Sequence, residues 1–157
     1  MASEIKVDTI VNAGGDNDTG IDLATNDQIL LKVANATRLT MNSTGQTTIV
    51  GEGGTTTTSL QQGLAKCWCQ LNGTGTIAVQ DSFNRSGITD NGTGDYTVTY
   101  TNNMANDDYA VGGGGNASQF TFDGVPTTST VTVETSNSSG TQADITCVTV
   151  TTHGDLA

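Results

Sequence analysis

Three cysteines and one histidine are the most chemically versatile side chains of this chain. Cys67, Cys69, Cys147 and His153 could together form a Cys₃His zinc site, which needs four convergent ligands. A single residue separates Cys67 from Cys69, whereas zinc ligands are usually spaced two to four residues apart. We therefore interpret the cysteines as small apolar strand residues with reduced thiols, and we predict no metal centre.

A second candidate set of ligands is the segment DNDTGID at residues 16–22, which has side-chain oxygens at alternate positions, as calcium loops do. The twelfth position counted from Asp16 is Asp27, where an EF-hand has glutamate. A turn rich in Asn and Asp is the preferred interpretation, and calcium binding is the alternative.

The sequence offers no complete set of catalytic residues. His153 lies four residues from the last residue, where we expect the chain to fray, so a Ser-His-Asp or Cys-His arrangement would lack support. We predict no enzymatic activity, no catalytic residue and no cofactor. Trp68, the single tryptophan, is out of phase with Cys67 and Cys69 on the same strand. It could stack on a sugar ring, but packing or a subunit contact is the preferred interpretation.

Charge and hydropathy limit the partners. Five Lys and Arg against 16 Asp and Glu give a net charge of -11 and leave no basic patch for a phosphate backbone. The aliphatic run at residues 29–31 is too short to span a bilayer, so we expect no membrane insertion. Residues 1–4 carry no secretory signal, and we expect synthesis in a host cytoplasm.

The elements that position these residues are short strands separated by turns. In the first third we predict strands at residues 4–11, 20–24, 28–34, 37–41 and 46–50. Each strand offers two or three aliphatic side chains, about half of what a packed layer needs. Three copies around an axis would pool them, and we predict a trimer core of Ile29, Leu31, Val33, Leu39, Ile49, Leu60 and Leu64.

A low-complexity joint, GEGGTTTT at residues 51–58, precedes a short helix. Ser59 and Gln62 form a Ser-x-x-Gln capping box, and Gly63 limits the helix to about two turns. We expect this helix to be a neck where the chains meet.

The remaining chain predicts a run of hairpins, with strands at residues 65–71, 76–82, 95–101, 109–112, 119–122, 130–134 and 143–151. Tyr96, Val98 and Tyr100 alternate with threonines, and NGTG occurs twice as a turn sequence. The fold class is therefore all-β. We predict an N-terminal trimeric stalk at residues 1–58, a helical neck at 59–66 and an antiparallel β-sandwich at 67–157.

Several stretches resemble proteins of tailed bacteriophages. GLAKCW at residues 63–68, NGTGT at 72–76, SGITDNGTGDYTVTY at 86–100 and DYAV at 108–111 resemble a C-terminal domain of tail-fibre and related virion proteins, especially from phages of marine bacteria and cyanobacteria. ILLK at residues 29–32 and TRLTMNSTG at 37–45 look like the fibre segment that often precedes this domain, and SEIKVDTI at 3–10 looks like the start of such proteins.

This resemblance implies a homotrimeric appendage on the virion surface, attached through its N-terminal section and displaying its C-terminal domain. Cys67 and Cys69 depart from the family pattern, in which small and aliphatic residues are usual. The chain is also much shorter than most such fibres, which favours a short head fibre or a capsid decoration protein over a long tail fibre.

Three hypotheses follow. The first is a short trimeric fibre that binds a bacterial surface glycan or protein through loops of the outer domain. The predicted contact residues are Asn102, Asn103, Asp107, Asp108, Gly113 and Asn116. The second is a capsid decoration or cement protein, in which strand 4–11 attaches to coat subunits through Ile5, Val7 and Ile10. The third is a free carbohydrate-binding module, which would not need to trimerise.

Overall fold

The computed structural model describes residues 7–12, 19–25, 27–51, 53–116 and 119–157. Ile5, a predicted attachment residue, lies outside this range. So do residues 16–18 of the segment interpreted as a turn, with calcium binding as the alternative. The described chain is all-β apart from one helical turn, as the sequence predicts. It divides into two compact units, Met1–Gly63 and Leu64–Ala157.

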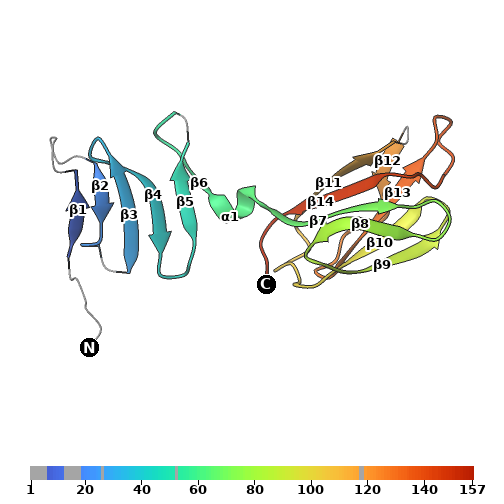
Figure 1. The fold of residues 1–157 in the computed structure, drawn as a ribbon, viewed down its shortest axis with the longest axis horizontal. Helices are drawn as coiled ribbons and strands as arrows, with labels where there is room; N and C mark the ends of the chain where they lie inside the picture. The colour runs from blue at the N-terminus through green and yellow to red at the C-terminus, as the bar shows by residue number, and fades with distance from the viewer. Residues whose placement is uncertain (1–6, 13–18, 26, 52, 117–118) are drawn as a thin grey trace. The chain divides into compact units, whose positions relative to one another are not determined.

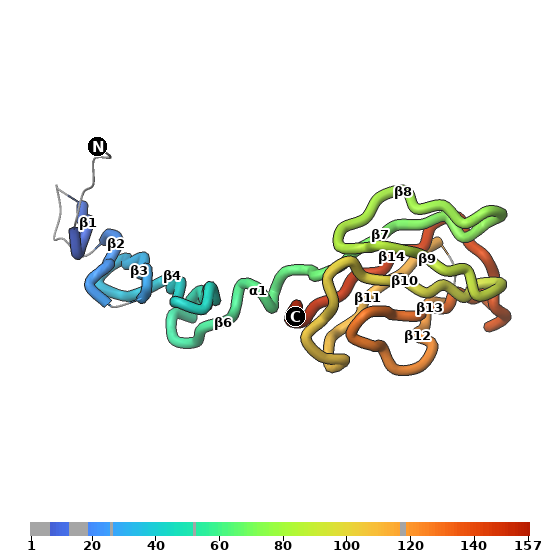
Figure 2. Tube along the Cα trace, turned by 90° about the horizontal axis from the view of Figure 1, so that it is seen from below, coloured from blue at the N-terminus to red at the C-terminus, as the bar shows by residue number. Residues whose placement is uncertain are grey.

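The first unit is one antiparallel sheet of six strands in sequence order (Figure 1). Its strands are β1 (Thr9–Val11), β2 (Gly20–Asp22), β3 (Gln28–Val33), β4 (Ala36–Asn42), β5 (Thr47–Val50) and β6 (Thr57–Ser59). In Figure 2 these strands follow one another in a single layer. None of the residues described in this unit, from 7 to 63, is buried.

The end of this unit adds one strand and corrects one prediction. The last two residues of the joint at 51–58 begin β6, which pairs with β5. The helix α1 (Leu60–Gly63) has one turn and not two. Its capping box is present in part, since the backbone N–H of Gln62 donates to Ser59 Oγ at 3.3 Å.

The second unit is a sandwich of two four-stranded antiparallel sheets, in the orders β12-β13-β10-β9 and β11-β14-β7-β8. The strands are β7 (Ala65–Asn72), β8 (Ala78–Phe83), β9 (Arg85–Gly92), β10 (Asp95–Tyr100), β11 (Ala110–Gly115), β12 (Gln119–Phe122), β13 (Thr130–Ser136) and β14 (Val148–His153). The sequence did not predict β9, and it placed the last strand too early, at 143–151.

A shared core joins the two sheets. Alternate side chains of β7, β10, β13 and β14 point inward, and the buried set is Cys67, Cys69, Leu71, Tyr96, Val98, Tyr100, Met104, Val131, Val133, Val148 and Val150. The predicted alternation in β10 is confirmed. On the other face of this sheet the hydroxyls of Thr97 and Thr132 are 2.8 Å apart, the cross-strand threonine pairing that the sequence suggests.

The NGTG sequence at residues 91–94, which is predicted to form a turn, spans the end of β9 and the connection to β10. Gly94 adopts a left-handed backbone with φ of 70°. A Cβ at this position would lie 2.5 Å from the carbonyl oxygen of Thr135. Glycine is therefore required here both by the backbone and by the close approach of β13.

Candidate functional site: an apolar sheet face and an aromatic shelf

The first candidate surface is one face of the N-terminal sheet. Residues directly opposite each other in antiparallel strands place their side chains on the same face. The pairings place one aliphatic side chain from each of five consecutive strands in a row, namely Ile10, Ile21, Leu31, Leu39 and Ile49. We call this set the aliphatic row.

The apolar character extends beyond the row. Ile29 and Met41 pair with each other beside Leu31 and Leu39. Val33 lies on the same face of β3, because it is two residues from Leu31. The side chains of Ile29, Leu31 and Val33 are 40%, 38% and 50% exposed. This face therefore leaves a continuous apolar surface open to solvent.

The opposite face of the same sheet is mostly polar. Its corresponding row is Thr9, Asp22, Leu30, Thr40, Thr48 and Ser59. Lys32 Nζ donates to Asp22 Oδ2 at 2.5 Å, and this bond is the main cause that lowers the pKa of the Asp22 carboxyl. The sheet is thus amphipathic, with one face suited to water and one face suited to burial.

The predicted trimer-core residues fall into two groups. Ile29, Leu31, Val33 and Leu39 share the apolar face. Leu60 lies in α1 and Leu64 follows it, and their side chains are 38% and 56% exposed. Of the predicted attachment residues, Ile10 is in the aliphatic row and Val7 is 43% exposed before β1.

The second candidate surface is the outer face of the sheet β11-β14-β7-β8. Trp68 is opposite Thr151, which is opposite Gly112, and in the next row Gln70 is opposite Thr149, which is opposite Gly114. A shallow depression of about 340 Å³ lies over these rows, between Trp68, Gln70 and the two threonines. We call this depression the aromatic shelf.

Trp68 does not pack in the core. Its side chain is 39% exposed, whereas Cys67 and Cys69 on either side are buried. Phe83 is directly opposite Trp68 on β8 and is 52% exposed, so both aromatic side chains lie on one face. The sequence predicts that Trp68 faces away from the cysteines, but the interpretation of packing is wrong within the sandwich.

The glycine run at residues 112–115 is part of a strand and not a loop, which corrects the placement of Gly113 in an outer-domain loop. It lies in β11 and pairs with β14 along its length. A Cβ on Gly113 would lie 2.2 Å from the ring of Phe120, and one on Gly115 would lie 2.2 Å from the carbonyl oxygen of Cys147. These two glycines permit the close packing of the strand on its inner side.

The predicted contact loops lie at opposite ends of β11. Asp108 precedes the strand, and Asn116 follows it. The amide of Asn116 is used within the fold, since Nδ2 donates to Thr146 Oγ1 at 2.7 Å and Oδ1 accepts from the backbone N–H of Cys147. Asn102 is held by Asn84 through two hydrogen bonds. These residues therefore do not form one site.

The other residues of the loop at 102–108 flank a buried anchor. Met104 is 1% exposed, and its backbone N–H donates to the carbonyl of Thr128 at 2.7 Å. The side chains of Asn103, Asp107 and Asp108 are exposed. The loop is thus fixed to the sandwich at its centre, with polar side chains on both sides of the anchor.

The proposed zinc set does not converge. All three cysteines are free, as predicted, and Cys67 and Cys69 point into the core. Burial, followed by the neighbouring Cys69 thiol, raises the pKa of Cys67 to about 12, and burial raises that of Cys69 to about 11. At neutral pH these thiols are protonated, which makes them poor nucleophiles and poor metal ligands.

His153 is not frayed, which corrects the expectation for the end of the chain. It lies in β14 and pairs with Ala110 on one side and Ala65 on the other. By alternation it belongs to the outer face, away from the buried cysteines. The sheet therefore holds the histidine and the Cys67 and Cys69 thiols on different sides.

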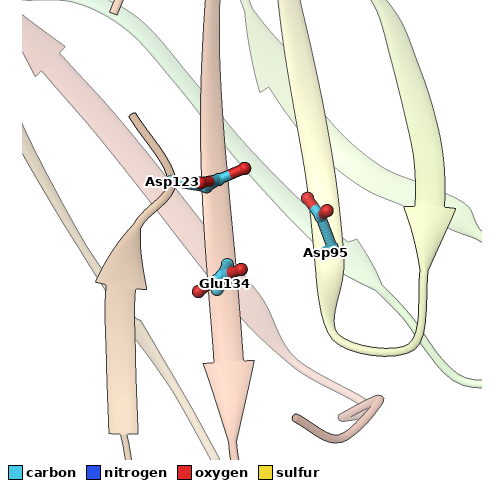
Figure 3. A group of neighbouring side chains, drawn as sticks. All are labelled: Asp95, Asp123 and Glu134. Carbon is cyan, nitrogen blue, oxygen red and sulfur yellow. The ribbon is translucent and has the colours of Figure 1, made fainter. Parts of the chain in front are cut away.

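An acidic group that the sequence does not predict lies on the other sheet. Asp95, Asp123 and Glu134 have carboxylate oxygens within 4.8 Å of one another (Figure 3). Asn91 Nδ2 donates to Asp95 Oδ1 at 3.0 Å, and Gln142 Nε2 donates to Glu134 Oε1 at 2.6 Å. These amides give the carboxylates partners within the protein, and the group carries no proposal of a metal site.

Known proteins give no further indication of the function of these two surfaces. Comparison of the chain with protein-family models, curated proteins and solved structures finds no match. Among the described residues, no helix has the length and apolar character needed to cross a membrane. The function must therefore be argued from the two surfaces themselves.

Proposed function

We propose that this chain is a structural protein of a tailed-phage virion, a homotrimeric short fibre displayed on the particle surface that contributes to attachment to a host-surface glycan or protein. The observation that carries the proposal is the N-terminal sheet, whose described residues form one layer with none of them buried. The sequence resemblance to phage fibre segments supplies the biological setting.

A single-layer sheet with one apolar face needs a cover. Sheets in soluble proteins bury such a face against a second layer. The aliphatic row and its neighbours Ile29, Val33 and Met41 find no second layer among the described residues of this unit. Three copies that turn this face toward a common axis would supply the cover to one another in a closed, symmetric assembly.

The polar face fits the same arrangement. Thr40, Thr48 and the Asp22–Lys32 pair would face outward into water. The sandwich has its own buried core and does not need assembly for stability. The proposed division of labour is therefore a stalk that requires three chains and a domain that each chain folds independently.

The virion location is tested by electron microscopy of purified particles. With gold-labelled antibodies against the sandwich, the fibre proposal expects label on the particle surface and slower adsorption of particles that lack the protein. Particles without label would contradict the location. A particle that adsorbs normally without the protein would contradict the role in attachment.

A capsid decoration or cement protein is the second candidate. It is supported by β1, which is at one edge of the N-terminal sheet and carries exposed Ile10 and Val11. Such an edge can pair with a strand of a coat subunit. Loss of the protein would then lower the heat resistance of filled heads and leave adsorption intact, the reverse of the result expected for a fibre.

A further inference from the structure

We propose that the aromatic shelf is a binding site for neutral pyranose oligosaccharides, in which the Trp68 ring stacks on a sugar face and the polar side chains around it bind hydroxyl groups. This proposal deepens the attachment role and rests on the proposed function for its biological meaning. The site lies on the outer face of one sheet of the sandwich.

The first step is the exposure of two aromatic side chains on the same face. Trp68 and Phe83 are cross-strand neighbours and are 39% and 52% exposed. The sandwich has a complete core without them. An indole that is open on one face offers a flat apolar surface together with one N–H donor, the combination that suits the C–H face and hydroxyl rim of a sugar.

The second step concerns the polar groups around the ring. Gln70, Thr149 and Thr151 line the depression with Trp68. Thr149 Oγ1 donates to the carbonyl of Gly114 at 3.1 Å, and Gln70 Nε2 donates to Cys147 Sγ at 3.1 Å. These bonds orient the side chains, while the Thr149 oxygen and the Gln70 carbonyl oxygen still have lone pairs that can accept from sugar hydroxyls.

The third step is the glycine at position 114. Gly113 and Gly115 are explained by packing, but a Cβ on Gly114 would meet no heavy atom within 4 Å. Its φ is not in the left-handed region, so the backbone does not require glycine either. A glycine inside a strand costs stability and often marks a place where another molecule approaches the backbone closely. Gly114 is beside the shelf, in the row of Gln70 and Thr149.

The charge of the site selects the class of ligand. No lysine, arginine, aspartate or glutamate lines the depression, and the chain has a net charge of -11. Asp81 is opposite Gln70 on the same face, and its side chain is exposed. Asp81 and the net charge of the chain would repel an anionic saccharide, whereas they would not repel a neutral one. The volume of about 340 Å³ is at the small end for a ligand site, which fits a short stretch of sugar rings.

The single tryptophan allows a direct test. We would titrate the full chain with cellohexaose, maltohexaose and a mannohexaose, each up to about 10 mM, and follow the emission of Trp68 and its quenching by acrylamide. We expect at least one of the three to give a saturable change with a Kd of roughly 0.1–10 mM and to protect Trp68 from the quencher. A polygalacturonate fragment should give no change.

The decisive variant is Gly114→Ile, which adds bulk beside the shelf. Because the added side chain meets open space, the midpoint of thermal unfolding should stay equal or rise, and calorimetry should show binding weakened at least roughly tenfold. Gly87→Ile is the matched control, since Gly87 is also a strand glycine with room for a Cβ but lies in β9 of the other sheet. The Gly87→Ile variant should bind the saccharide with the affinity of the unchanged chain. Phe83→Ala should weaken binding several-fold.

Four results would overturn the proposal. They are no response to any of the three neutral hexasaccharides, unchanged affinity in Gly114→Ile, a response to the polygalacturonate fragment alone, and a change of oligomeric state in Gly114→Ile. The last result would make the shelf a contact between copies. The oligomeric state is recorded for each sample by light scattering, so a failure of saccharide binding is distinguishable from a failure of the trimer.

Discussion

The two units of this chain treat their apolar side chains in opposite ways. In the sandwich, β7 and β14 face β10 and β13, and eleven apolar residues are buried between them. In the N-terminal sheet, six strands form a single layer, and the described residues include none that is buried. The difference shows that one unit of a chain can bury its own apolar side chains. Another unit can pair its strands through backbone hydrogen bonds and still leave an apolar face uncovered.

The largest expected effect comes from placing a charge in the aliphatic row. Leu39→Asp would bury a carboxylate in the contact that we propose between copies, and we expect the affinity between chains to fall more than roughly a thousandfold. Thr40→Asp is the matched control, because it is the next residue of β4 and lies on the polar face. Hydrogen exchange of β3 to β5 should become fast in the first variant and stay slow in the second. Equal protection in both would contradict the assignment of the faces.

The next effect distinguishes the buried core of the sandwich from the apolar face of the N-terminal sheet. Leu71 is fully buried in the sandwich, and Leu71→Ala should lower its free energy of unfolding by about 3 kcal/mol. Ile29→Ala should change the free energy of unfolding of the sandwich by less than about 0.5 kcal/mol, because Ile29 belongs to the other unit. Both are measured by urea unfolding followed through Trp68. A large loss in the second variant would mean that the sheet and the sandwich unfold together.

Alkaline pH should weaken the sandwich in particular. Burial raises the pKa of Cys67 from 9.0 to about 12, and burial, followed by the hydrogen bond to Asp144, raises that of Tyr96 to about 12. Because the folded state holds these groups protonated, their contribution is complete below the unfolded thiol value of 9.0 and is lost as pH rises toward 12. Urea unfolding between pH 8 and about 12 checks this, and Cys67→Ala should flatten the slope. A midpoint of urea unfolding that does not change with pH would argue against Cys67 and Tyr96 being buried and protonated.

The smallest effect concerns the polar face of the N-terminal sheet. The hydrogen bond from Lys32 lowers the pKa of the Asp22 carboxyl below 3.8. The stabilisation that this bond gives the folded sheet is therefore present above that pH, and it is lost as the carboxyl is protonated in acid. An NMR titration should place the Asp22 pKa below 3.8, and Lys32→Met should return it toward that value. Because the pair is near the surface, the midpoint of thermal unfolding should hardly change. An Asp22 pKa that does not respond to Lys32→Met would contradict the pairing.

What the sequence predicts well is strand periodicity. Tyr96, Val98 and Tyr100 alternate with threonine, and this pattern alone identifies the inward face of β10. The strand β9 is missed because it has one large apolar residue, Ile88, among polar residues and glycines, as an edge strand can. Gly113 and Gly115 favour a loop in any local reading, and only the contacts from Phe120 and Cys147 explain why they belong in a strand.

The candidate sites are less accessible to sequence reasoning because they depend on register between distant strands. The aliphatic row requires four pairings in the right register, although its members Leu31 and Leu39 were predicted from their strands. Alternation places the Trp68 side chain on the other face of the strand from the cysteine side chains. It does not predict whether this outer face is covered by another part of a protein. Asp95, Asp123 and Glu134 come from three separate segments, and only the pairing of β10 with β13 brings the first and the last together.

The central claim is that the N-terminal sheet is completed by other copies of the chain. Sedimentation equilibrium of the unmodified full chain, over protein concentrations from about 1 to 100 μM, tests this most directly. The account predicts a mass three times that of one chain, held down to low micromolar concentration. A chain that stays monomeric throughout this range, with the amides of β3 to β5 protected from exchange, would contradict it.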